Sequence, residues 1–303
     1  MRVIITGGSG FIGSKLTEKF ITLGHEIIIL SRNPSNTRLS ISQEIKFERW
    51  DGSTAQGWGN LVNQNTAIIN LAGENLSTGR WSSLRKKKII DSRVNAGKAI
   101  VNAIQLAEEK PKVLIQASAV GYYGVHQDEQ IEESQPAGND FLSDVCTKWE
   151  ASTSEVEEYG IRRVILRTGL VLDAEKGALP RLALPFKFFV GGKIGSGKQY
   201  IPWIHIQDEI QAINFLLKEE TAHGAYNLCA PNPVNNAEFA KTLGKIMERP
   251  SIFPVPPIAM KILFGEMSTV ILEGQRAIPD RLQEAGFEFN FPILEDALKN
   301  ILR

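Results

Sequence analysis

Short apolar runs alternate with longer amphipathic stretches over the first 170 residues of the chain. Most of the runs are continuous Ile, Val and Leu, which is typical of parallel strands buried on both faces. Six strands are predicted: Arg2–Thr6, Glu26–Leu30, Ile45–Arg49, Thr66–Leu71, Lys112–Ala117 and Arg162–Arg167. Three intervening stretches have helical periodicity: Phe11–Leu23, Ser82–Ala107 and Asp140–Tyr159. Repeated strand–helix alternation predicts an α/β fold with a doubly wound parallel sheet.

The amino-acid composition of the chain changes after about residue 170, where Gly and Pro become frequent. This composition predicts a smaller, irregular C-terminal α/β region over residues 171–303. Its predicted helices are His205–Lys218, Ala237–Glu248 and Ile293–Leu302. The stretch between Gly177 and Pro202 is predicted to be a mobile loop. Whether strands of this region return to the main sheet is left open by the pattern.

The overall charge balance narrows the range of partners. The 303 residues contain 34 Lys and Arg and 34 Asp and Glu, so the formal net charge is zero. A basic excess would be expected for general binding to nucleic acid or to anionic membranes, so neither partner is predicted. No apolar run approaches the ~18 residues of a membrane span, and no targeting segment is recognisable, so a cytoplasmic location is expected.

The two cysteines, Cys146 and Cys229, are too few and too far apart for a disulfide framework. Free cysteines are among the most buried residue types, so both are expected to be structural. The four histidines are scattered and form no cluster with metal-ligand spacing. No metal site is therefore predicted.

A glycine-rich segment follows the first predicted strand and opens the first predicted helix. Gly7 permits the tight turn, Gly10 lets the backbone approach a pyrophosphate, and Gly13 lets the helix pack closely on the strand. The helix then presents free N–H groups and the positive end of its dipole to the pyrophosphate. This context predicts a dinucleotide-binding Rossmann domain over residues 1–170. Its loop contributes Thr6, Gly7, Gly10, Phe11, Ile12 and Gly13.

The end of the second strand indicates which dinucleotide is bound. NAD-specific sites place an Asp or Glu there to bind the ribose 2′-hydroxyl, whereas this chain has Ser31 and Arg32. An arginine offers a planar fork of donors to a 2′-phosphate. NADP is therefore the predicted cofactor, with a solvated surface arginine as the alternative.

Two later strand ends are predicted to line the same crevice, because ligands of open α/β sheets bind outside the carboxyl ends of the strands. Asp51 follows the third strand, where an adenine edge is expected. Leu71, Ala72 and Gly73 follow the fourth and are small enough to let the adenosine approach closely.

Several motifs resemble the extended short-chain dehydrogenase/reductase superfamily of NAD(P)-dependent sugar epimerases and dehydratases. They are the glycine loop, Asn70-Leu-Ala-Gly73, and Ser118 before Tyr122-Tyr123-Gly124. An atypical branch, whose members are called epimerase-family proteins or cell-division inhibitors, is resembled over nearly the whole chain. The segments that carry this second resemblance are Gly73-Glu-Asn75, Arg80-Trp81, Ser92-Arg93, Lys148-Trp-Glu150, Arg167-Thr-Gly169, Pro202-Trp-Ile-His-Ile206 and Leu272-Glu-Gly-Gln275. The resemblance implies that Ser31, Arg32, Leu71, Ala72, Arg93 and Val171 lie near NADP.

The acid–base set of that superfamily is incomplete in this chain. The resemblance implies a Tyr four residues before a Lys on one helix, where the two face the same side. Lys148 is the candidate lysine, but Asp144 stands four residues before it. A carboxyl group has an ordinary pKa roughly six units below that of a phenol and does not simply replace it. Ser118 is the candidate for polarising the substrate oxygen, and Tyr122 is either a proton donor or a packing aromatic.

Two functions remain open at this point. The first is an NADP-dependent oxidoreductase or epimerase that transfers hydride at a hydroxyl or carbonyl carbon of a small molecule, a nucleotide sugar by the resemblance alone. The second is a catalytically silent NADP(H)-binding protein whose cofactor occupancy regulates a protein partner. Ser118 and Lys148 favour the first function, and the absent tyrosine favours the second. A homo-oligomer is compatible with either.

Overall fold

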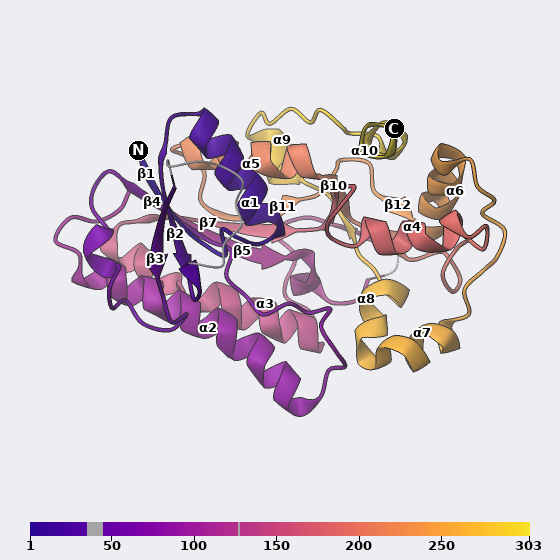
Figure 1. The fold of residues 1–303 in the computed structure, drawn as a ribbon, viewed down its shortest axis with the longest axis horizontal. Coiled ribbons are helices and arrows are strands. Elements are labelled where there is room, and N and C mark those ends of the chain that lie inside the picture. The colour runs from indigo at the N-terminus through magenta and orange to yellow at the C-terminus, as the bar shows by residue number, and fades with distance from the viewer. Residues whose placement is uncertain (35–44, 127) are drawn as a thin grey trace.

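The computed structural model describes residues 1–34, 45–126 and 128–303. Its centre is a seven-stranded parallel sheet in the order β11-β7-β5-β4-β1-β2-β3 (Figure 1). The strands are β1 (Arg2–Thr6), β2 (Glu26–Ser31), β3 (Ile45–Arg49), β4 (Thr66–Asn70), β5 (Val113–Ala119), β7 (Arg162–Thr168) and β11 (Gly224–Leu228). All six predicted strands form, and the predicted fold class is confirmed.

Helices cover both faces of this sheet (Figure 1). One layer contains α1 (Phe11–Thr22) and α5 (Ile206–Lys218), and the other contains α2 (Ser83–Leu106) and α3 (Phe141–Ala151). Successive side chains of a strand point to opposite faces, so each central strand supplies both layers. In β4, Ile69 packs into the core under α1 and α5, and its neighbour Ile68 packs into the core under α2. The continuous apolar runs of the sequence follow from this double burial.

The chain beyond residue 170 contributes both to the main sheet and to a separate core. β11 pairs with β7 at the edge of the main sheet. A third core lies between α4 (Leu179–Lys187), α6 (Asn236–Met247) and α10 (Leu294–Leu302). The remaining helices of this region are α7 (Pro257–Phe264), α8 (Thr269–Leu272) and α9 (Asp280–Glu284).

Three two-stranded ladders lie outside the main sheet, and the one between residues 130–131 and 276–277 joins the C-terminal region to the earlier part of the chain. They pair β8 (Leu170–Leu172) with β10 (Trp203–His205), β9 (Tyr200–Ile201) with β12 (Val234–Asn235), and β6 (Gln130–Ile131) with β13 (Arg276–Ala277). Short 3-10 helices complete the described chain: η2 (Gly59–Leu61), η3 (Val120–Tyr123), η4 (Ser154–Tyr159) and η5 (Gly265–Ser268).

Two local predictions differ from the structure. The stretch between Gly177 and Pro202 was expected to be a loop, but it contains α4. Pro180 is tolerated because it stands in the first turn, where its missing N–H is not needed. Leu179, Ala183 and Phe186 lie on one face and are buried in the third core, which stabilises the helix. The helix expected over Asp140–Tyr159 ends at Ala151 and is followed by η4.

Candidate functional site

The loop between β1 and α1 requires glycine because backbone approaches backbone there. Gly7 has φ +68°, and a Cβ at this position would lie 2.7 Å from the carbonyl oxygen of Leu71. A Cβ on Gly13 would lie 2.3 Å from the carbonyl oxygen of Gly7, so the first turn of α1 rests directly on the loop. No larger residue fits either position without moving the backbone. The loop therefore has the close packing that the glycine pattern predicted.

The N-terminus of α1 presents unpaired amides to the carboxyl edge of the sheet. Gly10 is the N-cap and has no side chain that could cap the helix, and the first turn carries no acidic residue. The first intrahelical bond runs from the Ser14 amide to the Gly10 carbonyl oxygen, at 2.9 Å. The amides of Phe11, Ile12 and Gly13 are thus those that a helix leaves for a ligand. Together with the helix dipole, they fit a pyrophosphate.

Phe11 brings a residue of the C-terminal region to this loop. A Cβ on Gly177 would lie 2.9 Å from Cε1 of Phe11 and 3.2 Å from the carbonyl oxygen of Val171. Val171 lies in β8, which follows directly after β7. The structure therefore brings Phe11 and Val171, both predicted to contact the cofactor, to the same place.

Thr6 holds the strand ends together beneath the loop. Its side chain is fully buried, and its hydroxyl donates to Asn70 Oδ1 at 2.6 Å and accepts from the Ala72 amide at 3.2 Å. Asn70 Nδ2 in turn donates to Gln116 Oε1 at 2.9 Å. This buried chain joins the carboxyl ends of β1, β4 and β5, and it fixes the positions of Leu71 and Ala72. Thr6 acts on the site through the backbone that it orders.

Ser31, Arg32 and Asp51 lie at the ends of β2 and β3, as expected. Ser31 Oγ accepts from the Asn33 amide at 3.2 Å, and the Arg32 side chain is exposed. Asp51 Oδ1 accepts from the amides of Ser53 and Thr54, and these bonds, led by the one from Ser53, lower the pKa of Asp51. The Asp51 carboxylate is therefore engaged in its own turn, and its contact with adenine stays a prediction.

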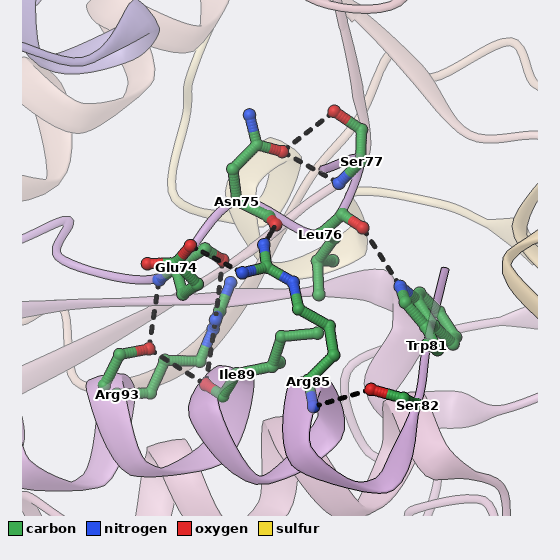
Figure 2. A network of polar contacts seen from close by, with 10 residues as sticks. Glu74, Asn75, Leu76, Ser77, Trp81, Ser82, Arg85, Ile89 and Arg93 are labelled. Carbon is green, nitrogen blue, oxygen red and sulfur yellow. Dashed lines mark hydrogen bonds and ion pairs between the residues drawn. The ribbon is translucent and has the colours of Figure 1, made fainter. Parts of the chain in front are cut away.

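The loop that follows β4 is fastened to α2 by two arginines, as Figure 2 shows. Arg85 Nη1 donates to Glu74 Oε1 at 2.7 Å, and Arg85 Nη2 donates to the carbonyl oxygen of Asn75. Trp81 Nε1 donates to the carbonyl oxygen of Leu76 at 3.0 Å, closing the same loop. The pKa of Glu74 is lowered, first by the hydrogen bond from Arg85 and also by the positive charge of Arg32. Glu74 in this loop thus interacts electrostatically with Arg32, the residue predicted to bind the 2′-phosphate.

Arg93 lies beneath Gly73 and supports the loop from within. Its Nη1 donates to the carbonyl oxygens of Glu74 and Ile89, at 3.1 and 3.0 Å, and its guanidinium stacks on Trp149 at 4.7 Å. Burial lowers the pKa of Arg93 to about 10. A Cβ on Gly73 would lie 2.9 Å from Arg93 Cζ, so only glycine leaves room for this contact. Arg93 Nε is buried without a partner in the described structure. It leaves one donor free beside the glycine loop between β1 and α1, called the cradle here.

Ser118, at the carboxyl end of β5, belongs to a buried ionic network. Its Oγ donates to Glu150 Oε1 at 2.6 Å. Glu150 lies on α3 and forms a two-pronged ion pair with Arg167 of β7, with both N–O distances at 3.0 Å. All three residues are buried, with at most 8% of their surface exposed. The Ser118 hydroxyl therefore donates to Glu150, and the buried Cys146 thiol lies within hydrogen-bond reach of the same hydroxyl.

Two tyrosines flank the Arg167 guanidinium. Arg167 Nη1 donates to Tyr123 Oη at 3.0 Å, and Tyr123 Oη donates to Asn227 Oδ1 at 2.7 Å. Tyr123 is 1% exposed, and burial raises its pKa. Tyr122 stacks on Arg167 at 3.5 Å and is only partly buried. Tyr123 is thus a core residue. Tyr122 lies beside the ionic network of Ser118, Glu150 and Arg167, and its phenol is accessible to solvent.

Lys148 does not reach this network. It forms an exposed ion pair with Asp144, at 2.7 Å, and half of its side chain is accessible. On a helix, position 148 lies about 200° around the axis from positions 146 and 150. Cys146 and Glu150 face the strands and are buried. The structure therefore places the two residues of the incomplete motif, Asp144 and Lys148, on the outward face of α3.

Glu150, Arg167 and Asn227 were not assigned roles from the sequence. Glu150 and Arg167 stand in the segments Lys148-Trp-Glu150 and Arg167-Thr-Gly169, which carried the resemblance, but nothing in either segment indicates that they pair. An acidic residue at 150 and a basic one inside an apolar strand at 167 were the available signal, because isolated buried charges are rare. His205 has a structural role as the N-cap of α5, because its Nδ1 accepts from the Gln207 amide at 3.0 Å.

Family models match almost the whole chain. Residues 3–229 match the NAD dependent epimerase/dehydratase family, and residues 255–301 match a domain of unknown function, DUF1731. Epimerase family protein YfhF of Bacillus subtilis is 40% identical over 303 residues, which cover 100% of this chain and 98% of that protein. A chloroplastic homologue of epimerase family protein SDR39U1 in Arabidopsis thaliana is 39% identical, with 100% and 87% covered.

Solved structures agree with this assignment. Human epimerase family protein SDR39U1, crystallised with NADPH, superposes with a TM-score of 0.88 at 34% identity and 99% coverage of both chains. UDP-glucose 4-epimerase of Thermus thermophilus, in complex with NAD, has a TM-score of 0.77 at 18% identity, with 99% of this chain and 97% of that one covered, a likeness of fold. The chain described here therefore belongs to the NAD-dependent epimerase/dehydratase family and, within it, to the group of SDR39U1-like epimerase family proteins.

Proposed function

We propose that this protein binds NADP(H) and catalyses a hydride-transfer reaction on a hydroxyl or carbonyl carbon of a small molecule. The glycine cradle in front of α1 carries the cofactor part of the proposal, because its uncapped amides fit a pyrophosphate. Arg32 and Ser31 would hold the 2′-phosphate, and Phe11 and Val171 would lie against the other half of the cofactor. The human relative crystallised with NADPH supports the choice of NADP(H).

The bound cofactor supplies the hydride acceptor or donor. This chain's own residues would position the substrate oxygen and handle its proton. Ser118 Oγ donates to Glu150, so it would accept the hydrogen of a substrate hydroxyl and hold the oxygen in place. Tyr122, stacked on Arg167 and partly exposed, is the group we assign to exchange the proton. Glu150 and Arg167 act as positioning residues, since Glu150 accepts the hydrogen bond from Ser118 and Arg167 holds the Glu150 carboxylate in an ion pair.

Transfer of isotope from deuterated NADPH tests this proposal. The protein is incubated with NADPH deuterated at the nicotinamide C4 and a panel of carbonyl compounds, keto derivatives of nucleotide sugars among them, because the reduced cofactor delivers hydride only to a carbonyl carbon. The products are analysed by mass spectrometry. Deuterium should appear in a product with the wild-type protein, and the rate should fall by about 100-fold or more in Tyr122→Phe. Lys148→Ala is the matched control and should retain the rate. Absence of transfer to every compound, under conditions where NADPH binds, would contradict the proposal for this panel.

A second function is favoured by one observation. Asp144 and Lys148, which stand at the four-residue spacing on α3, point outward, so the Tyr–Lys pair of the superfamily has no counterpart at this place. A protein that binds NADP(H) without turnover would use occupancy of the cradle to order the C-terminal region for a protein partner. Tight NADPH binding, no isotope transfer, and capture of a partner only in the presence of NADPH would together select this function.

A further inference from the structure

Large apolar side chains are unusually exposed on one part of the C-terminal region. Among the described residues, thirteen large hydrophobic side chains are exposed, and eight of them come from two segments. These eight, called the apolar patch here, are Leu184, Phe188, Phe189, Val190, Ile252, Phe253, Ile258 and Ile262, with exposed fractions of 49–72%. At roughly 100 Å² each they present about 800 Å², more than the few hundred Å² usual on a monomer.

The two segments lie side by side, so the apolar patch is continuous. Gly191 bridges Ser251 and Ile194 bridges Val255, both in parallel orientation. The Phe253 amide donates to the Gly191 carbonyl oxygen at 3.1 Å. The patch then continues onto α7, where Ile258 and Ile262 are one turn apart on the same face. Figure 1 shows α4, α6 and α7 at the end of the molecule away from β3.

The backbone at the centre of the apolar patch holds an aromatic ring outward. Phe189 has φ +63°, a conformation that bulky residues rarely adopt. Its ring is 55% exposed and carries the guanidinium of Arg249 at 4.5 Å. Phe189 directly follows the C-cap of α4, and the Val190 amide donates to the Pro185 carbonyl oxygen at 3.0 Å, so the positive φ is the left-handed turn that ends this helix.

The two segments that carry the apolar patch contain basic but no acidic residues. The chain has five basic and no acidic residues from Lys176 to Gln207, and two basic and no acidic residues from Arg249 to Gly265. Lys187, Lys193 and Lys261 are exposed and take part in none of the ion pairs found in the described part of the chain. The flanking acids are already paired, Glu248 with Arg303 and Glu266 with Lys86.

We propose that the apolar patch and its basic rim dock on an anionic lipid bilayer surface. Exposed Phe and Ile side chains insert at the headgroup boundary, and each nearby Lys or Arg is attracted electrostatically to the anionic lipids. A second copy of the chain would bring the same basic rim against itself, so self-association through this face is disfavoured. Within the described residues no helix is long and apolar enough to cross a bilayer, so the contact is peripheral. This local surface departs from the expectation that zero net charge excludes membranes.

Vesicle co-sedimentation tests the proposal. The whole protein is mixed with vesicles of phosphatidylcholine alone, or with vesicles in which about a third of the lipid is phosphatidylglycerol. Wild-type protein should sediment with the anionic vesicles, less so with neutral ones, and less at high salt. The variants Phe188→Ser/Ile252→Ser and Lys187→Glu/Lys261→Glu should each bind at least about tenfold more weakly.

Matched controls separate the patch from general effects. Leu106→Ser removes a side chain that is 73% exposed on α2, and Lys98→Glu reverses an exposed charge on the same helix; both should bind vesicles as the wild type does. All variants should keep the unfolding temperature and NADPH affinity, since none touches the cradle. The proposal is overturned if wild-type protein ignores anionic vesicles or if the patch variants bind equally well. Concentration-dependent dimerisation abolished by Phe188→Ser/Ile252→Ser, without vesicle binding, would assign the face to a second copy instead.

Discussion

Glu209 is a carboxyl group buried without a charge partner, and its replacement makes a quantitative prediction. It lies on α5, is 1% exposed, and accepts one hydrogen bond, from Thr168 Oγ1 at 2.9 Å. Its second oxygen, Oε2, is buried and has no partner among the described residues. Burial raises the pKa of Glu209 from 4.5 to about 8, so the folded protein holds this carboxyl neutral at neutral pH.

The sign of the effect follows from linkage. The folded pKa lies above the unfolded one, so the stability contribution is complete below pH ~4.5 and is lost as the pH rises towards about 8. At about 1.4 kcal/mol for each pKa unit, the loss is on the order of 5 kcal/mol. Glu209→Gln keeps the acceptor for Thr168 and cannot ionise. We therefore expect the variant to resemble wild type near pH ~4.5 and to exceed its stability increasingly up to about pH 8.

Thermal unfolding measured from about pH 5 to about pH 9 tests this prediction. The difference in unfolding temperature between Glu209→Gln and wild type should grow with pH, by about 1.5 °C for each kcal/mol in a chain of 303 residues. Glu288→Gln, at an exposed position, is the control and should follow wild type at every pH. Parallel curves for Glu209→Gln and wild type over the whole range would show that the buried carboxyl does not titrate as reasoned here.

Three further predictions concern the cradle, the ionic network and α3. Gly13→Ala should abolish NADPH binding measured by nicotinamide fluorescence, because its Cβ would lie 2.3 Å from the Gly7 carbonyl oxygen, and binding at wild-type affinity would refute the cradle. Arg167→Met should lower the free energy of unfolding in urea by about 3–5 kcal/mol, since Glu150 stays buried and unpaired, and a loss below ~1 kcal/mol would contradict this. Lys148→Met should change NADPH affinity by less than about twofold, because Lys148 faces outward; a tenfold loss, measured by the same titration, would contradict this outward placement.

The fold could be predicted from the sequence because each element had a local signal. The strands beginning at Arg2 and Glu26 start one residue before their apolar runs, and Gly24 and Gly160 follow helices in the positive-φ conformation expected of C-terminal glycines. The helix α4 was missed because Pro180 and Pro185 read as loop residues. Its formation depends on a core supplied by α6 and α10, which no local pattern in α4 reveals.

The cofactor half of the site could also be predicted, because it is made mostly from backbone whose glycine spacing is visible in the sequence. The half of the site around Ser118, to which we assign the chemistry, could not be predicted. Lys148 and Glu150 are two residues apart on one helix, and only the packing of α3 against the sheet decides which of them faces Ser118. The partner of Glu150 is Arg167, from a different strand, and such a pair is fixed by tertiary structure alone.

The central claim is that this chain binds NADP(H) through Arg32, and paired titrations test it most directly. Nicotinamide fluorescence is followed as NADPH or NADH is added to wild type, to Arg32→Ala, and to the exposed control Lys98→Ala. We expect wild type to prefer NADPH, and Arg32→Ala to lose about 10- to 100-fold in NADPH affinity with little change for NADH, because a charge-assisted contact to the 2′-phosphate is removed. Equal loss for both dinucleotides, or no preference in the wild type, would contradict the role of Arg32, and failure of the wild type to bind either would contradict the account as a whole.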